Sequence, residues 1–365
     1  MPTVRCIECN LSYPESGLPY RCPACGGFYD LDGPLIFDPD QLEKNLPGYW
    51  RFRHTFSLFA NSPVISLGEG NTPLIWEKAY HKTVGMKMES FNPTASFKDR
   101  GSAVLVSQLL ARGITSAVED SSGNAGASFA AYAARAGLKA RVFVPAAASG
   151  PKRVQIERFG AELVRVPGPR SEAGRRVKEE AEAGATYASH AYIPFGLSGV
   201  ATIAYEIWED MEEAPGTVIA PVGHGGLLLS VVRGFSALKN RGLIKHVPYY
   251  VGVQAKACAP MVAIFNEDQK AMDAVVEGAT LAEGVRIRYP VQANNLKKEI
   301  HRGEGEFVSI EEEEILPAFY DLAQRGFYVE PTSTLAWCGL KVLASKLPEP
   351  IILVLTGSGL KAQIY

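Results

Sequence analysis

The sequence predicts an α/β protein of two domains, in which parallel strands alternate with helices. Its 365 residues are enough for two separate hydrophobic cores. From about Val84 onward, short apolar runs typical of buried strands alternate with longer helical patterns. Units of this kind build parallel sheets, and such sheets bind ligands beyond the carboxyl ends of their strands. We therefore expect the functional residues directly after the strands.

The individual elements follow from the same patterns, taken in chain order. Strands are expected where apolar or alternating runs are short, and helices where alanine-rich or mixed runs are longer. Consecutive parallel strands should be joined by right-handed crossovers. The predicted strands are 84–89, 115–118, 140–144, 163–166, 216–220, 249–253 and 351–355, and the predicted helices are 127–136 and 151–159.

Composition and charge exclude several classes of protein. The formal net charge is -2, which favours neither a nucleic-acid partner nor a membrane surface. No apolar run approaches the roughly 18 residues that a membrane-spanning helix needs. The segment from Met1 to Cys6 lacks the apolar core of a secretory signal. These features predict a cytoplasmic enzyme.

Four of the six cysteines lie in the first 25 residues, as two Cys-x2-Cys pairs separated by twelve residues. Each pair can present two sulfurs to one ion, which suits tetrahedral zinc. Disulfides are disfavoured in a reducing compartment, whereas knuckles that hold no metal remain an alternative. Four thiolates leave no open coordination position, so the metal would be structural. Cys258 and Cys338 are expected in the core. The predicted zinc ligands are Cys6, Cys9, Cys22 and Cys25.

One lysine, Lys98, follows an Asn-Pro turn and precedes a long helical run. An amine at a helix start lies near the positive ends of backbone dipoles, which disfavour its protonated form. A neutral amine is the species that attacks an aldehyde. Lys98 is therefore a candidate for a Schiff base with a cofactor aldehyde. For an isolated motif, a solvated lysine between Asp99 and Arg100 is the ordinary interpretation.

Three further motifs follow predicted strands. The run from Ser121 to Gly126 opens a helix and suits an anionic group such as a carboxylate. The run from Gly223 to Leu227 contains three glycines, whose amides can surround a phosphate, although it is not a P-loop. Within that run, His224 is either a substrate contact or an incidental loop residue. Thr356 to Lys361 ends the last strand. Each motif alone is also typical of an ordinary turn.

Together these motifs resemble the pyridoxal-phosphate-dependent fold type II (tryptophan synthase β-like) family, in its threonine synthase branch. The family's lysine motif matches Asn92 to Gly101, with Ala95 in place of glycine. The Ser-x-Gly-Asn element, the glycine-rich loop and the terminal Leu355 to Lys361 run also match. Residues 67–74 resemble a further motif of the branch, and zinc knuckles are common in its long members. The resemblance spans essentially the whole chain.

The resemblance implies a role for each matched residue. Lys98 would be the Schiff-base lysine and general base of pyridoxal 5'-phosphate, and Asn124 would contact the ring hydroxyl. Thr356 would bind the pyridine nitrogen, and a hydroxyl there leaves that nitrogen largely unprotonated. The cofactor phosphate would be held by Gly223, His224, Gly225, Gly226 and Leu227, and the substrate by Ser121, Ser122 and Ala125.

The chain departs from the branch at several positions. Ala125-Gly126 stands where the branch usually has Thr-Ala, and His224 stands where it has asparagine. Members place an arginine that helps to bind the substrate phosphate before the helix that Leu197 opens, where this chain has the run Tyr192 to Gly196 without a cation. A partly buried phosphate needs a paired charge, which Lys152 or Arg153 could supply.

The resemblance implies a two-domain fold type II enzyme with parallel-rich twisted sheets and an N-terminal zinc ribbon. It predicts a ribbon at 1–30, a large cofactor domain at 31–105 and 206–365, and a small mobile domain at 106–205 that closes on the substrate. The expected reaction converts the small amino-acid substrate O-phosphohomoserine and water into threonine and phosphate, in a homodimer. The alternatives are a threonine or serine dehydratase, a β-replacement synthase of the cysteate synthase type, and a non-catalytic cofactor-binding protein.

Overall fold

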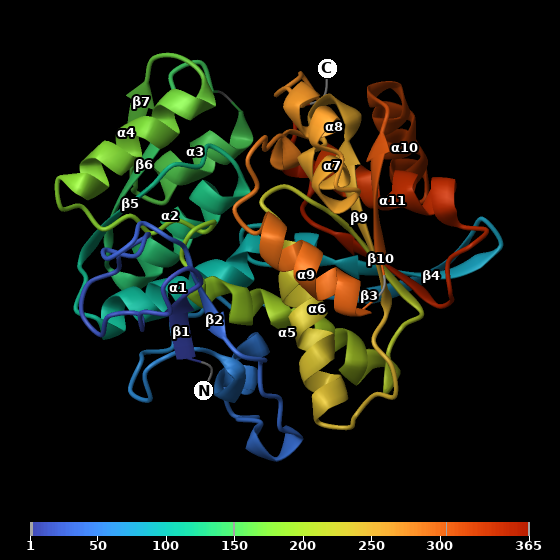
Figure 1. The fold of residues 1–365 in the computed structure, drawn as a ribbon, viewed down its shortest axis with the longest axis horizontal. Coiled ribbons are helices and arrows are strands. Elements are labelled where there is room, and N and C mark those ends of the chain that lie inside the picture. The colour runs from blue at the N-terminus through green and yellow to red at the C-terminus, as the bar shows by residue number, and fades with distance from the viewer. Residues whose placement is uncertain (1–2, 149, 304, 364–365) are drawn as a thin grey trace. The chain divides into compact units, whose positions relative to one another are not determined.

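The computed structural model describes residues 3–148, 150–303 and 305–363. These residues form two compact units. Unit 1 comprises the described residues of 1–70, 92–200 and 363–365, and unit 2 comprises 71–91 and 201–362. Each unit is built around its own sheet (Figure 1). The chain therefore has two separate cores, as its length predicts.

Unit 1 contains a three-stranded parallel sheet in the order β5-β6-β7. The helices α2 and α4 both pack against β6, and α3 packs against α2 (Figure 1). A cluster on the sheet side of α4, with Val118, Phe143 and Val177, is buried from solvent. The elements of this sheet and its helices are α1 (Lys98–Ala111), β5 (Ser116–Glu119), α2 (Asn124–Ala136), β6 (Lys139–Pro145), α3 (Pro151–Arg158), β7 (Glu162–Val166) and α4 (Arg170–Glu182).

The N-terminal part of unit 1 is a small two-stranded ribbon. Strand β1 (Thr3–Cys6) pairs antiparallel with β2 (Tyr29–Asp32), and Thr3 lies opposite Asp32. Most of the following segment is irregular up to the short helix η2 (Gly48–Thr55). Its aromatic side chains Tyr49, Trp50 and Phe52 are fully buried, so this segment belongs to the core of the unit.

Unit 2 is built on a six-stranded sheet in the order β10-β9-β8-β11-β4-β3. All its neighbouring pairs are parallel except the antiparallel hairpin of β3 and β4. Helix α11 packs against β8, β9 and β11, α10 packs against α11, and α6 packs against α9. The strands are β3 (Leu74–Ala79), β4 (Lys82–Met88), β8 (Thr217–Pro221), β9 (Tyr249–Ala255), β10 (Gly305–Ile310) and β11 (Ile351–Leu355). The helices are α5 (Phe195–Met211, which begins in unit 1), α6 (Gly226–Asn240), α7 (Pro260–Phe265), α8 (Gln269–Ala274), α9 (Ala293–Gly303), α10 (Glu312–Gln324) and α11 (Pro331–Leu343).

The predicted strands and helices are confirmed, with bounds that shift by a few residues at most. The largest shift is in α2, which begins at Asn124 instead of residue 127 because the helix already includes the small residues after Gly123. Cys258 and Cys338 are buried, as predicted. Strands β1, β2, β3 and β10 were not predicted. Strand β3 lies at the edge of its sheet, and it contains the exposed Trp76 and the charged Glu77 and Lys78. Its sequence therefore lacks the apolar run by which the buried strands were recognised.

Candidate functional site

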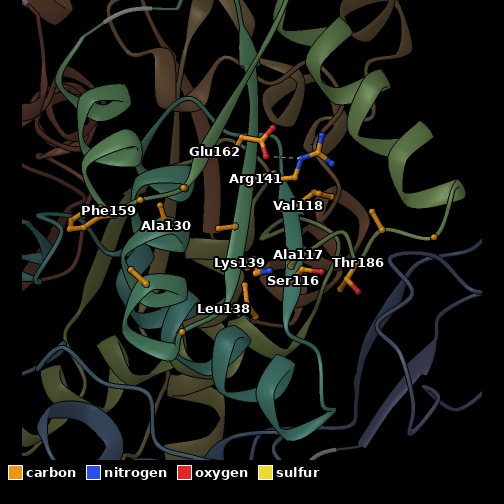
Figure 2. Close-up of a pocket in the computed structure, with 17 residues that line it drawn as sticks. Ser116, Ala117, Val118, Ala130, Leu138, Lys139, Arg141, Phe159, Glu162 and Thr186 are labelled. Carbon is orange, nitrogen blue, oxygen red and sulfur yellow. Dashed lines mark ion pairs between the residues drawn. The ribbon is translucent and has the colours of Figure 1, made fainter.

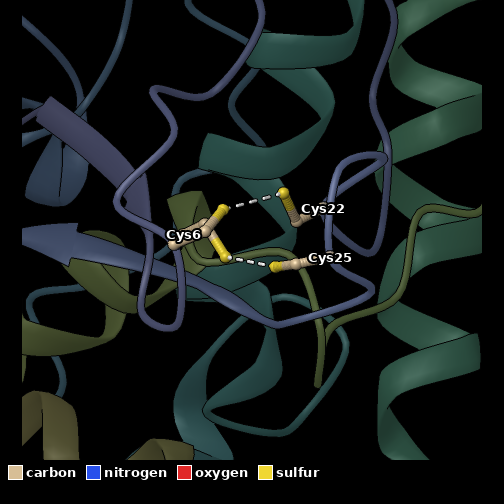
Figure 3. Close-up of side chains that lie close together, drawn as sticks. Cys6, Cys22 and Cys25 are labelled. Atoms are coloured by element: carbon tan, nitrogen blue, oxygen red, sulfur yellow. Dashed lines mark hydrogen bonds between the residues drawn. The ribbon is translucent and has the colours of Figure 1, made fainter.

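The four N-terminal cysteine sulfurs converge on one point, and three of these residues are labelled in Figure 3. All four sulfurs lie within 4.8 Å of one another. Cys6 Sγ is 3.5 Å from Cys25 Sγ, and Cys9 Sγ is 3.6 Å from Cys22 Sγ. Zinc–sulfur bonds of about 2.3 Å in a tetrahedron place the sulfurs about 3.8 Å apart. The donor set therefore has the chemistry and nearly the spacing of a structural zinc site.

The ribbon packs on a segment that leads into α5. The ring of Tyr20 contacts those of Tyr187 and Tyr192, with centroids 5.3 and 5.7 Å away. Tyr13 contacts the ring of Phe195 at 5.0 Å. In the run 192–196, where the resemblance leads us to expect a phosphate-binding arginine, the ring of Phe195 packs against the ribbon. That ring serves the packing of the ribbon.

Lys98 is the first residue of α1 and is half-buried. The next residue, Asp99, is fully buried and accepts hydrogen bonds from the backbone and hydroxyl of Thr94, each at 2.6 Å. The hydroxyl of Ser128 in α2 donates a third bond of 2.6 Å to Asp99. These bonds fix the turn that presents Lys98. Ala95 in this turn has φ of 62°, a conformation that favours glycine.

The segment from Ser121 to Asn124 forms the tight connection between β5 and α2. The amide of Gly123 donates to the Ser121 hydroxyl at 3.2 Å. A Cβ at position 126 would lie 1.8 Å from the Ser121 carbonyl oxygen, so only glycine fits at this one position of the first turn of α2. Ser122 and Asn124 are partly exposed, whereas Ser121 and Ala125 are buried. Ala125 is therefore placed for packing more than for a contact through its side chain.

A buried acidic cluster precedes this segment, and the sequence analysis did not identify it. Glu119 at the end of β5 is buried, and one of its carboxylate oxygens lies 2.6 Å from Nδ1 of His190. The neighbouring Asp120 accepts a hydrogen bond of 2.7 Å from Tyr187. The charge of Lys98 acts on both Glu119 and His190. The lysine thus has a carboxyl and an imidazole in its electrostatic neighbourhood.

Burial sets the protonation of this cluster. It raises the pKa of Glu119 to about 7, a rise that Arg170 and Lys98 partly oppose. Burial, followed by the charge of Lys98, lowers the pKa of His190 well below its ordinary value. Both groups are therefore held toward their neutral forms, and Glu119 keeps its proton up to about pH 7. A signal for this site was present in the sequence, because Glu119 and Asp120 directly follow a predicted strand.

In unit 2 the glycine-rich loop connects β8 to α6. Gly225 has φ of 94° and caps the helix, which begins at Gly226 and therefore presents its free amides at the loop. A Cβ at Gly223 would lie 2.9 Å from the carbonyl oxygen of Gly284. The backbone oxygen of His224 accepts from the amide of Gln292 at 3.0 Å. The free amides at this helix start could bind an anion, and Leu227 in the first turn of α6 is buried.

Thr356 at the end of β11 belongs to a buried polar network. Its hydroxyl donates to Glu330 at 2.8 Å and lies 2.9 Å from the hydroxyl of Ser333. The side chains of Thr356, Glu330 and Ser333 are all buried. A Cβ at Gly357 would lie 2.8 Å from the Glu330 carboxyl group, which explains the glycine there. Glu330 and Ser333 were not identified from the sequence, because Glu-Pro before a helix is also an ordinary helix start.

These features fit the cofactor that the resemblance implies. The α6 amides and glycines suit a phosphate, and Thr356 offers a buried polar group at a neighbouring strand end. Unit 1 holds Lys98 together with the Ser121–Asn124 connection, and unit 2 holds the glycine-rich loop together with Thr356. The Ser121–Asn124 connection, the glycine-rich loop and Thr356 thus each follow a parallel strand, whereas Lys98 lies at the start of α1.

A cavity of about 570 Å³ lies in unit 1, at the opposite ends of its strands (Figure 2). It is lined by the residues that begin β5, β6 and β7, including Ser116, Lys139 and Glu162. The side chain of Arg141 pairs there with Glu162 at 3.4 Å. None of the predicted site residues lines this cavity. It is not the candidate site.

Comparisons with known proteins identify the family of the chain. Residues 65–357 match the family described as pyridoxal-phosphate dependent enzyme. A threonine synthase from Methanocaldococcus jannaschii is 34% identical over 98% of this chain and 92% of the relative. A threonine synthase from Methanosarcina acetivorans is 30% identical over 98% of this chain and 92% of the relative.

Solved structures share the fold at lower identity. Threonine deaminase isoform 2 from Solanum lycopersicum, in its processed form, has a TM-score of 0.68 and 21% identity, and the match covers 93% of this chain and 95% of its own. L-serine ammonia-lyase from Rhizomucor miehei has a TM-score of 0.68 at 20% identity. The match covers 80% of this chain and 94% of the ammonia-lyase chain. At these identities the likeness establishes the fold alone. Among the described residues, no helix is long and apolar enough to cross a membrane.

Proposed function

Because this chain belongs to the pyridoxal-phosphate dependent enzyme family, we propose that it is an enzyme of the threonine synthase type. It would convert O-phosphohomoserine and water into threonine and phosphate. The observation that carries this proposal is the match to a threonine synthase over 98% of the chain at 34% identity. The lysine motif from Asn92 to Gly101 supports it.

Each of the predicted site residues would have a separate role in this reaction. Pyridoxal phosphate, when bound, supplies an electron sink for negative charge at the substrate's α carbon. Lys98 would hold the cofactor and then move protons at the α and β carbons. Asn124 would contact the ring hydroxyl, and Gly223 to Leu227 would bind the cofactor phosphate. Water would supply the new hydroxyl group at the β carbon as phosphate leaves the γ carbon.

The substrate phosphate needs a cation, and we propose Arg170 for this role. Arg170 begins α4, and its charge acts on Glu119, Asp120 and His190, the cluster that also feels Lys98. It would replace the arginine that the resemblance implies in the run 192–196. An Arg170→Gln variant should raise KM for phosphohomoserine about tenfold or more, while kcat falls less. Equal kinetics in Arg170→Gln and the unsubstituted protein would exclude this role.

The reaction is tested with a panel of substrates. Purified protein loaded with the cofactor is incubated with phosphohomoserine, phosphoserine, threonine or serine, and phosphate and ketoacid are measured. We expect phosphate and threonine from phosphohomoserine alone. Lys98→Ala should abolish turnover and the visible absorption of the lysine-bound cofactor. Lys139→Ala, at the far end of the sheet, serves as the matched lysine control and should retain both.

Other outcomes would replace the proposal. Release of 2-oxobutyrate from threonine, with phosphohomoserine left intact, would make the protein a dehydratase. Lysine-dependent absorption without product from any amino acid would make it a non-catalytic cofactor-binding protein. Product from phosphoserine with an added nucleophile would indicate a β-replacement synthase.

We also propose that one zinc ion is bound by the four N-terminal cysteines, with a structural role. The convergent sulfurs support this assignment. Metal analysis of purified protein should give one zinc per chain, and Cys9→Ser should reduce this to well below one. The family resemblance further supports a cytoplasmic homodimer in which residues 106–205 close on the substrate. Light scattering and solution scattering with and without phosphohomoserine would test the dimer and the closure.

A further inference from the structure

We propose that the hydroxyl of Tyr29 donates a hydrogen bond to the thiolate of Cys22 when the ribbon holds zinc, and thereby tightens the binding of the metal. The inference rests on the proposed zinc site and goes beyond its four cysteines. Tyr29 is not a ligand in this proposal. It is a positioning residue, because it acts on the metal through the sulfur of Cys22.

The pairing of β1 with β2 brings Tyr29 to the side of the ribbon that carries the sulfurs. Tyr29 lies directly opposite Cys6 in this antiparallel pair. Residues that face each other in this way carry their side chains on the same face of the sheet, with Cβ atoms about 5 Å apart. Tyr29 and Cys6 are 1% and 2% exposed, so this is the inner face of the ribbon. The tyrosine side chain therefore starts from the same buried face as the first of the predicted zinc ligands.

The hydroxyl of Tyr29 has a hydrogen to give. The ring of Tyr29 contacts that of Tyr13, with centroids 4.5 Å apart and planes inclined at 64°. The hydroxyl of Tyr13 is engaged elsewhere, since it donates to the carbonyl of Pro19 at 2.9 Å. The hydroxyl of Tyr29 is buried and makes no well-formed hydrogen bond among the described residues. Because a buried tyrosine hydroxyl usually has a partner, this exception indicates a partner that depends on a bound ligand.

The electrostatic neighbours of this hydroxyl are cysteine sulfurs. Burial raises the pKa of Tyr29, and Cys22, Cys6 and Cys9 raise it further. Among the three, Cys22 is the sulfur that acts on the hydroxyl at hydrogen-bonding range. A negative sulfur nearby favours the phenol that keeps its hydrogen. Tyr29 is therefore held in the form that can donate to a sulfur.

Zinc changes what the sulfurs need. Four thiolates exceed the charge of one zinc ion, so the loaded site is an anion whose sulfurs accept hydrogen bonds. The exposed Cys9 and Cys25 can be hydrated, and Cys25 also accepts from the amide of Gly27 at 3.4 Å. Cys22 is 2% exposed and is shielded from water. A hydrogen bond from Tyr29 to Cys22 would satisfy a buried hydroxyl and a buried thiolate together.

The test measures the affinity for zinc. Zinc-loaded protein is titrated with a competing chelator at one pH. Tyr29→Phe removes only the hydroxyl and should bind zinc about tenfold more weakly, or worse. Tyr13→Phe removes the neighbouring hydroxyl, whose partner is a carbonyl oxygen, and should bind zinc as tightly as the unsubstituted protein does.

Cobalt in place of zinc supplies a second readout. The difference in absorption between cobalt-loaded and zinc-loaded protein isolates the sulfur-to-cobalt charge-transfer band from the absorption of the cofactor. A hydrogen bond lowers the energy of the sulfur lone pairs, so Tyr29→Phe should move this band to lower energy. A tyrosine that only packs against the ribbon would not affect the position of the band.

Equal zinc affinity in the unsubstituted protein and in Tyr29→Phe, shown to be folded by circular dichroism, overturns the inference. A weaker affinity without a shift of the band overturns it as well, and so does an equal loss in Tyr13→Phe. If Tyr29→Phe does not fold, the unsubstituted protein loaded with 113Cd decides by nuclear magnetic resonance. We expect a coupling between the metal and the hydroxyl hydrogen of Tyr29, and its absence overturns the inference. A protein that binds no zinc at all would contradict the proposed metal site itself.

Discussion

Nδ1 of His190 lies 2.6 Å from a carboxylate oxygen of the buried Glu119, and the charge of the candidate lysine acts on both groups. The short distance is typical of an ion pair, whereas the pKa shifts of both groups favour their neutral forms. Burial is the common cause, because it penalises a charge on either side chain. We assign the proton to Glu119, which can then donate to His190.

The first prediction concerns the pH dependence of stability. The pKa of Glu119 rises from 4.5 to about 7 on folding, so its contribution is present below pH 4.5 and is lost as pH rises through 7. The pKa of His190 is lowered, so its contribution is lost as pH falls below 6.5. The Glu119 contribution should therefore decline between about pH 4.5 and pH 7, by at most about 3 kcal/mol, and the His190 contribution opposes this decline below about pH 6.5.

The measurement is urea unfolding at about pH 6 and about pH 8.5, on either side of the Glu119 transition. Glu119→Gln mimics the protonated carboxyl group, so it should remove the part of the decline between these two pH values that comes from Glu119. The pKa of Asp120 is also raised by burial and adds a residual slope of the same sign, while Arg170 and Lys98 oppose the Glu119 shift. An equal slope in Glu119→Gln and the unsubstituted protein would show that Glu119 does not control this transition.

The second prediction concerns Ala95, which occupies a left-handed conformation with φ of 62°. In this conformation a residue with a Cβ lowers the free energy of unfolding by about 1–2 kcal/mol through steric strain. Glycine avoids this strain but lowers the free energy of unfolding by about 0.4–1 kcal/mol, because it gives the unfolded chain greater freedom. Ala95→Gly should therefore stabilise the protein by up to about 1 kcal/mol. Ala134→Gly in the helix α2 is the control, and should destabilise by about 1 kcal/mol. A lower urea midpoint for Ala95→Gly would contradict the prediction.

The third prediction concerns Glu69, a fully buried carboxylate within the 67–74 motif. It accepts from the indole of Trp50 at 2.7 Å, the hydroxyl of Tyr132 at 2.6 Å and the amide of Leu67 at 2.9 Å. Glu69→Ala leaves three donors without their acceptor and should cost about 3 kcal/mol or more in unfolding free energy. The exposed Glu182→Ala should change it by less than about 0.5 kcal/mol. Comparable losses in both variants would contradict the assigned role.

The fourth prediction concerns removal of metal from the ribbon. Chelation should lower the melting temperature of the unsubstituted protein, because the ribbon contributes to the packing of Tyr187 and Phe195. Cys9→Ser should already melt at the lower temperature and respond little to the chelator. Cys258→Ser, in the core of unit 2, should remain sensitive to chelation. A Cys9→Ser protein that chelation destabilises as much as the unsubstituted one would exclude this metal site.

Sequence patterns predicted the central strands and the order of the motifs because buried parallel strands are almost wholly apolar. The convergence of the four cysteines was also predictable, since the spacing of each pair limits where its sulfurs can lie. The partner of Thr356 was not, because Glu330 is 26 residues away along the chain and meets it only through tertiary contacts. His190 and Glu119 are 71 residues apart and escaped notice for the same reason.

Helix α1 connects the lysine at its first residue to the N-terminal ribbon. At its other end the capping residue Arg112 donates to the ribbon carbonyls of Pro14, Glu15 and Gly17, at 2.6, 3.0 and 3.0 Å. The 14 residues of α1 span about 21 Å as a rigid rod. A shortened protein without the ribbon would lose the hydrogen bonds of Arg112 that hold this end of α1. It would also expose the ring of Phe195 to water. Loss of activity on such trimming would therefore report mechanical support of the lysine rather than a missing chemical group.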